Sequence, residues 1–102
     1  MKKIINGKKY DTENAEFLGY RNNDYFPEDF RFCEETLYRT PSGRYFLFGE
    51  GGPLSNYAAL QGGGYTSSGR IIPLLEKRAQ RWAERYLSAD EAEAAFGAAE
   101  EA

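Results

Sequence analysis

The sequence contains no histidine and a single cysteine, Cys33, among its 102 residues. The usual zinc sites and hydrolytic triads that use a histidine base are therefore excluded, and one thiol cannot form an intramolecular disulfide. Because no histidine is present to activate it, we expect Cys33 to pack as a small apolar residue. We predict no metal site and no cofactor, and only carboxylate, Tyr, Ser or Lys chemistry remains open to an enzyme.

Long apolar segments are also lacking. No run approaches the ~20 apolar residues of a membrane span, and Ile4 and Ile5 fall far short of the apolar region of a signal peptide. We therefore predict a cytoplasmic protein that does not contact a membrane. The net charge is −3 and the pI is near 5.0, which argues against broad phosphate binding and is compatible with a basic protein partner.

Aromatic residues, in contrast, are plentiful at 16% of the chain. Two aromatic-rich runs, 30–40 and 44–49, flank the turn Pro41-Ser42-Gly43 and predict a central β-hairpin. The register set by this turn gives both faces of the hairpin apolar side chains. The expected neighbours across the hairpin are Thr36 and Phe48, Leu37 and Leu47, Tyr38 and Phe46, and Arg39 and Tyr45.

Local signals also predict the elements before this hairpin. Asn6-Gly7 favours a type I′ turn between strands at 2–5 and 8–11. Thr12 is suited to cap a short helix over 13–18, which Gly19 would end. Arg31, Glu34 and Glu35 interrupt the apolar alternation near the start of the central hairpin, which suggests a bulge or an edge there.

The second half of the chain is predicted to contain loops, a short strand and two helices. Most of the 11 glycines lie between Gly49 and Gly69, so we expect loops there, with one helical turn at 56–60 capped by Ser55. A short strand at 70–72 is expected to end at Pro73, before a helix at 74–87. The sequence Ser88-Ala89-Asp90-Glu91 is a capping box that begins a second helix, which Gly97 ends. The apolar stripe of the first helix is formed by Leu75, Ala79, Trp82, Ala83 and Tyr86.

Together these elements predict a single α+β domain over residues 1–97, followed by a frayed acidic tail at 98–102. The expected sheet is small, antiparallel and built on hairpins. One short N-terminal helix and two C-terminal helices complete the predicted fold, with the helices packed on one face.

A surface for a protein partner is the site that the residues favour. We expect its carboxylates to cluster on one exposed side, where they are solvated charge or a contact patch. The aromatic residues Tyr20, Tyr25 and Phe26 either anchor an interface or fold back over the sheet edge, and we favour the second. The predicted partner-binding residues are Asp24, Tyr25, Glu28, Asp29, Glu34, Glu35 and Glu50.

No catalytic residues are predicted. Glu34 and Glu35 are adjacent, so in a strand they point to opposite faces and cannot share a substrate without a bulge. An enzyme acting on a small molecule remains a third hypothesis, which requires a deep pocket near Glu50 and Tyr38.

The alternative site is a basic helix face that binds nucleic acid or an acidic protein. It consists of Lys77, Arg78, Arg81 and Arg85, three of which recur at intervals of four. Because no aromatic residues interleave with these charges, a solvated helix face is the interpretation we favour for them.

Several runs of the chain carry a resemblance to known proteins. They are Lys3 to Thr12, Glu34 to Arg39, Tyr45 to Pro53, Ile71 to Leu74 and Trp82 to Glu84. With these runs the chain resembles a group of small accessory proteins carried by phages and integrative elements of gut bacteria. The resemblance implies a mobile-element accessory role, and proteins of that kind include anti-CRISPR inhibitors and inhibitors of other host defences.

The leading functional hypothesis is therefore a non-enzymatic inhibitor that binds a host defence protein, such as a CRISPR effector, through an acidic and aromatic surface. The alternative is a small nucleic-acid-binding or regulatory protein that uses the basic face of the helix at 74–87. A homodimer formed through a sheet edge or an apolar face is compatible with either function.

Overall fold

A four-stranded antiparallel sheet with the strand order β3-β4-β5-β8 organises the chain. The computed structural model describes all residues from 1 to 102. The sheet strands are β3 (Glu16–Asn22), β4 (Cys33–Arg39), β5 (Tyr45–Gly51) and β8 (Ser68–Leu74). Two hairpins and two helices complete the fold: β1 (Lys2–Ile5) with β2 (Lys8–Asp11), β6 (Ala59–Gln61) with β7 (Gly64–Thr66), α1 (Glu76–Tyr86) and α2 (Ala89–Phe96).

The central hairpin has the predicted register. Thr36, Leu37, Tyr38 and Arg39 of β4 lie opposite Phe48, Leu47, Phe46 and Tyr45 of β5. The turn closes through a hydrogen bond from the Gly43 amide to the Thr40 carbonyl, 2.9 Å long, with Gly43 at φ +90°. Glycine adopts this left-handed conformation without steric cost, which is why the turn signal in the sequence was reliable.

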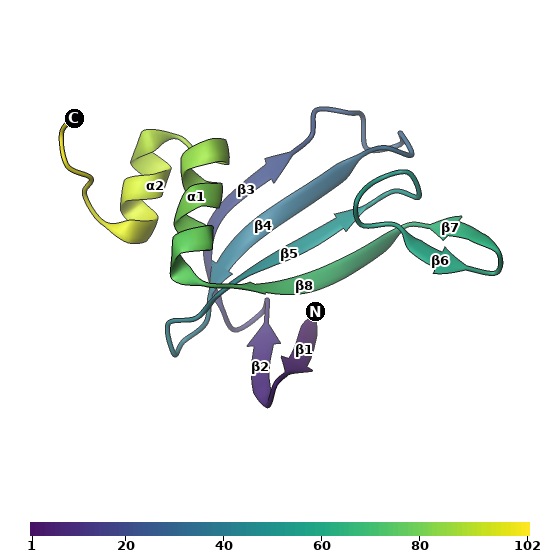
Figure 1. Ribbon diagram of the computed structural model, residues 1–102, viewed down its shortest axis with the longest axis horizontal. Helices are drawn as coiled ribbons and strands as arrows, with labels where there is room; N and C mark the ends of the chain where they lie inside the picture. The colour runs from purple at the N-terminus through teal and green to yellow at the C-terminus, as the bar shows by residue number, and fades with distance from the viewer.

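Both faces of the sheet carry a hydrophobic core. On one face, Leu37 and Leu47 pack with Trp82 and Ala79 of α1. On the other, Tyr10 of the N-terminal hairpin packs with Phe46 and Ile71; the Tyr10 and Phe46 ring centroids are 5.4 Å apart. Figure 1 shows the two helices at one end of the sheet, with the β6–β7 hairpin and the 23–32 loop at the opposite, distal end.

The predicted N-terminal helix at 13–18 is wrong, because β3 begins within it and continues past Gly19. Pairing with β4 satisfies the backbone of this segment, a non-local contact that outweighs the weak local helix signal. Thr12 instead accepts a hydrogen bond from the N-terminal amine at 3.0 Å. The β-bulge lies in β3, between Phe17 and Gly19, rather than at the start of the central hairpin.

The loop and strand predictions around the sheet also need correction. The central strand begins at Cys33 instead of residue 30, since the Asp29 carboxylate accepts the Arg31 amide at 2.8 Å in a local turn. Residues 56 and 57 lie in a turn and β6 begins at Ala59, so the helical turn expected at 56–60 is wrong. Strand β8 runs through Pro73, which an edge strand tolerates because it has no neighbour on one side.

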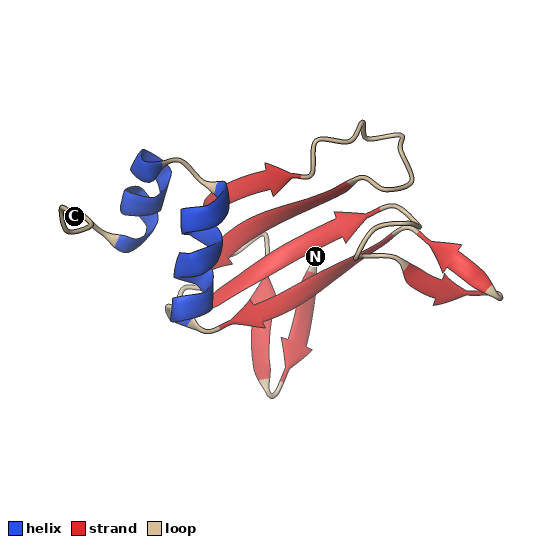
Figure 2. Ribbon diagram, turned by 45° about the horizontal axis from the view of Figure 1, so that its top comes forward, coloured by secondary structure: helices blue, strands red, loops and turns tan.

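The C-terminal helices form largely as predicted. Leu75 is the exception, since it is the N-cap of α1 and is 78% exposed, so the buried stripe begins at Ala79. The capping box of α2 is present, with Ser88 accepting the Glu91 amide at 3.1 Å and Glu91 accepting the Ser88 amide at 3.0 Å. Gly97 is the C-cap of α2, and no regular structure follows it. Figure 2 shows the two helices next to each other at one end of the molecule, with strands and loops making up the rest.

Candidate partner-binding site

A surface hollow of about 680 Å³ opens at the distal end of the sheet, and we call it the distal hollow. Its walls come from three segments, residues 27–34, 50–53 and 65–69. The amides of Gly52 and Leu54 donate to the carbonyls of Phe32 and Phe30, both at 2.9 Å. These bonds hold two of the three walls together.

Four of the predicted carboxylates line the distal hollow: Glu28, Asp29, Glu34 and Glu50. Glu34 and Glu50 lie directly opposite each other on β4 and β5, and like charges in this arrangement repel. Partial burial and the neighbouring Glu34 carboxylate raise the pKa of Glu50 above its usual range. The hollow therefore holds closely spaced negative charge on the sheet face opposite the helices.

Within the chain, one of these four carboxylates has a cationic partner. The Arg31 guanidinium lies 2.8 Å from Asp29, and its hydrogen bonds lower the pKa of Asp29 to about 2. Glu34 accepts a hydrogen bond from the uncharged Tyr20 hydroxyl at 2.8 Å. Negative charge thus remains for a cation supplied from outside.

Large apolar side chains surround this charge. Phe30 and Tyr65 line the hollow and are 64% and 68% exposed. Phe26 is 81% exposed, so the expectation that Tyr20, Tyr25 and Phe26 fold back over the sheet edge is wrong for Phe26. The reason is that Asn23 and Asp29 hold the loop in its own turns, through bonds to Cys33 and Arg31; Figure 1 shows it extending beyond the ends of β3 and β4.

The other predicted site residues lie elsewhere. Asp24 and Tyr25 are exposed in the 23–32 loop but do not line the hollow, and the Arg31 guanidinium covers the Tyr25 ring at 4.3 Å. Tyr38 stacks on Phe46 with ring centroids 5.2 Å apart, so it takes no part in the hollow near Glu50 that an enzyme would require. Lys77, Arg78, Arg81 and Arg85 are all exposed on α1, at the other end of the molecule, and form no ion pair.

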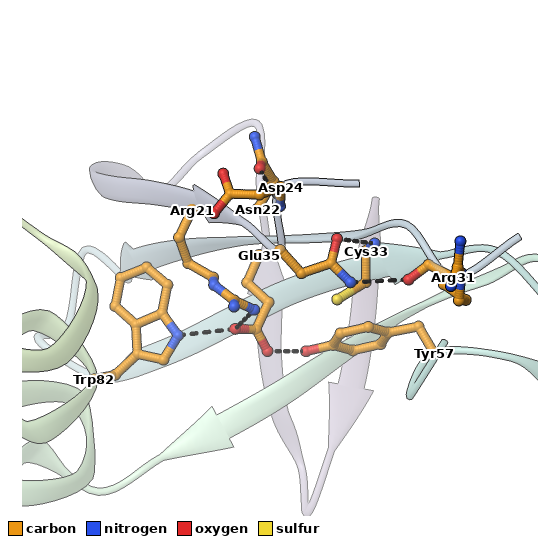
Figure 3. A network of polar contacts seen from close by, with 9 residues as sticks. Arg21, Asn22, Asp24, Arg31, Cys33, Glu35, Tyr57 and Trp82 are labelled. Carbon is orange, nitrogen blue, oxygen red and sulfur yellow. Dashed lines mark hydrogen bonds and ion pairs between the residues drawn. The ribbon is translucent and has the colours of Figure 1, made fainter. Parts of the chain in front are cut away.

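Glu35 is separated from Glu34, as the strand alternation predicted, and faces the helices. Its carboxylate accepts hydrogen bonds from Trp82 Nε1 at 3.0 Å, from Arg21 Nη1 at 3.3 Å, and from the Tyr57 hydroxyl. Figure 3 shows these three donors, which come from three separate segments, converging on the one carboxylate. The Glu35 side chain is 16% exposed, so its interpretation as solvated surface charge is wrong.

The network around Glu35 connects three separate segments of the chain. Both carboxylate oxygens already accept hydrogen bonds, and Glu35 lines none of the surface hollows. The Arg21 guanidinium also covers the Tyr86 ring at 4.2 Å. Burial and Glu35 raise the pKa of the Tyr57 hydroxyl, so Tyr57 is a hydrogen-bond donor at neutral pH.

Tyr57 and Arg21 were not predicted from the sequence as members of this network. The available signal was Gly49 within a strand, since glycine there marks a close approach by another group. A Cβ at Gly49 would lie 2.0 Å from Tyr57 Cζ, so the Tyr57 ring occupies the space that the glycine leaves. Cys33 is buried beside this network, as expected for a small apolar residue, and burial raises the pKa of its thiol.

Comparison of the chain with protein-family models, curated proteins and solved structures gives no match. No helix of the structure combines the length and the apolar character needed to cross a membrane.

Proposed function

We propose that this chain is a non-enzymatic inhibitor that binds a host defence protein, such as a CRISPR effector, through the distal hollow. The observation that carries the proposal is that four carboxylates and two exposed large apolar side chains, Phe30 and Tyr65, line one concave surface. Such a surface is complementary to a segment that combines Lys or Arg with apolar residues.

The two components of this surface have different roles in binding. Exposed aromatic side chains such as Phe30 and Tyr65 are suited to anchor an interface, because they bury a large area with few rotatable bonds. The carboxylates select a cationic partner and speed its approach. The basic residues of a nucleic-acid channel have this chemistry, which together with the resemblance to mobile-element accessory proteins supports a defence nuclease as the partner.

Affinity capture from a bacterial lysate with matched charge-reversal variants tests this function. The Glu34→Lys/Glu50→Lys variant should lose a partner that the unmodified chain retains, because it reverses the charge of the hollow. The Lys77→Glu/Arg81→Glu variant alters α1 at the other end and should keep the same partner. Loss with the α1 variant and retention with the hollow variant would instead favour the alternative below.

The alternative function is nucleic-acid binding by α1. It is favoured by one observation, the four exposed basic side chains of α1 that have no acidic partner in the chain. Filter binding of single- and double-stranded DNA and RNA over a range of salt concentrations tests it, since binding through phosphates must weaken steeply as salt rises. The chain's acidic net charge opposes such binding.

A further inference from the structure

Residues 52–67, which we call the arm, have a single buried side chain; the Gly52 and Leu54 amides also bond to the 23–32 loop, and the Asn56 carbonyl accepts a hydrogen bond from Arg70 at 3.2 Å. Tyr57 is 3% exposed, whereas every other side chain between Gly52 and Ser67 is half-buried or exposed. The arm contains the β6–β7 hairpin, which projects from the distal end of the sheet in Figure 1. Its stability relative to the sheet therefore depends on how Tyr57 is held.

Both ends of the arm form walls of the distal hollow. Gly52 and Pro53 precede Tyr57, and Tyr65, Thr66 and Ser67 follow it, and all five line the hollow. The Tyr57 ring fits over Gly49 of β5, its hydroxyl donates to Glu35, and the Arg70 guanidinium lies 5.0 Å from its ring centroid. A movement of Tyr57 therefore displaces one side of the hollow.

The geometry points to Tyr57 and Glu35 as a latch that controls the width of the distal hollow. With Tyr57 seated on Gly49 and bonded to Glu35, the arm is closed; when Tyr57 leaves, the arm lifts as a unit and the hollow widens. The same carboxylate accepts the indole N–H of Trp82, so opening of the arm alters the environment of the chain's one tryptophan. This inference rests on the proposed function for its use of the hollow, but the latch itself is tested without a partner.

Hydrogen exchange of the full chain, measured by NMR, tests the latch with the variant Tyr57→Phe. Loss of a hydrogen bond to a charged acceptor should raise the opening equilibrium of the arm by about tenfold or more. Exchange should accelerate at the amides of Gly52 and Leu54, which join the arm to the 23–32 loop. Amides of β4 and β5 should keep their protection. The control is Tyr65→Phe, which removes an exposed hydroxyl from the same arm.

A second variant opens the latch in a different way. The three atoms nearest to the Cβ of Gly49→Ala would all belong to the Tyr57 side chain, two in the ring and one the hydroxyl oxygen, so this variant should expel Tyr57 without removing its hydroxyl group. Both variants should produce the same local pattern of exchange, and both should shift the Trp82 indole N–H resonance. Equal acceleration across β4, β5 and the arm, or no acceleration at Gly52 and Leu54 in either variant, would overturn the latch.

The outcomes separate the latch from the proposed function. Faster amide exchange confined to the arm, with no partner captured from the lysate, would support the latch and contradict the binding function. Partner binding that depends on Glu34 and Glu50 would support the function. If the latch variants then showed no faster exchange in the arm, the latch would be contradicted.

Discussion

Two adjacent glutamates show how strongly position decides the role of a residue. Glu34 lies in the distal hollow beside Glu50, whereas Glu35 accepts three hydrogen bonds on the opposite face of the sheet. Strand alternation made their separation predictable from the sequence. The burial of Glu35 was not predictable, because its donors Arg21, Tyr57 and Trp82 are distant in the sequence and meet only in the folded chain.

Glu35→Ala should be among the most destabilising substitutions at a charged residue. It leaves the Arg21 guanidinium, the Trp82 indole and the Tyr57 hydroxyl without their acceptor, at an expected cost of about 3 kcal/mol in the free energy of unfolding. Urea denaturation monitored by far-UV circular dichroism measures it. Glu34→Ala is the matched control and should change the free energy by less than about 1 kcal/mol; equal costs for the two would contradict the assigned network.

The carboxylate pair of the distal hollow predicts a pH dependence. Because the folded pKa of Glu50 is raised, its ionisation disfavours the folded state. This penalty is absent below the unfolded pKa, develops as the pH rises towards the folded pKa, and is complete above it. Glu34→Gln removes the neighbouring charge and should lower the pKa of Glu50 in a ¹³C NMR titration of its carboxyl group. An unchanged pKa would show that the two side chains do not interact.

At the scale of elements, the local signals were reliable where one turn or cap determines the structure. The turn at Gly43 determined the register of the central hairpin, and the capping box determined the start of α2. Strand β3 could not be foreseen, because it exists through pairing with β4 and its own sequence contains a helix cap signal and a glycine. The distal hollow likewise depends on segments 27–34, 50–53 and 65–69 coming together, which sequence spacing does not show.

Gly19 of β3 lies close to Leu87, in the segment between the two helices. A Cβ at this position would lie 2.5 Å from both Leu87 δ-carbons, so Gly19→Ala should cost about 1–3 kcal/mol of unfolding free energy through overpacking. In a Leu87→Ala background the added methyl has room, and the cost should fall. A double-mutant cycle by urea denaturation measures the coupling, which should be about 1 kcal/mol or more. Additive effects would show that the two residues are not in contact.

At the scale of the whole molecule, the basic face of α1 and the distal hollow lie at opposite ends of a body 50 Å long. The basic side chains of α1 are at the helical end, and the carboxylates of the distal hollow are at the other. We propose binding at the distal end, because carboxylates and the exposed aromatic side chains of Phe30 and Tyr65 line the same hollow there. A partner bound at that end leaves α1 free.

The most direct test of this central claim is a hydrogen-exchange footprint of the chain in complex with its captured partner. We expect slower exchange in residues 27–34, 50–53 and 65–69, with residues 77–85 of α1 exchanging as in the free chain. Protection confined to 77–85, with the three walls of the distal hollow unchanged, would contradict it.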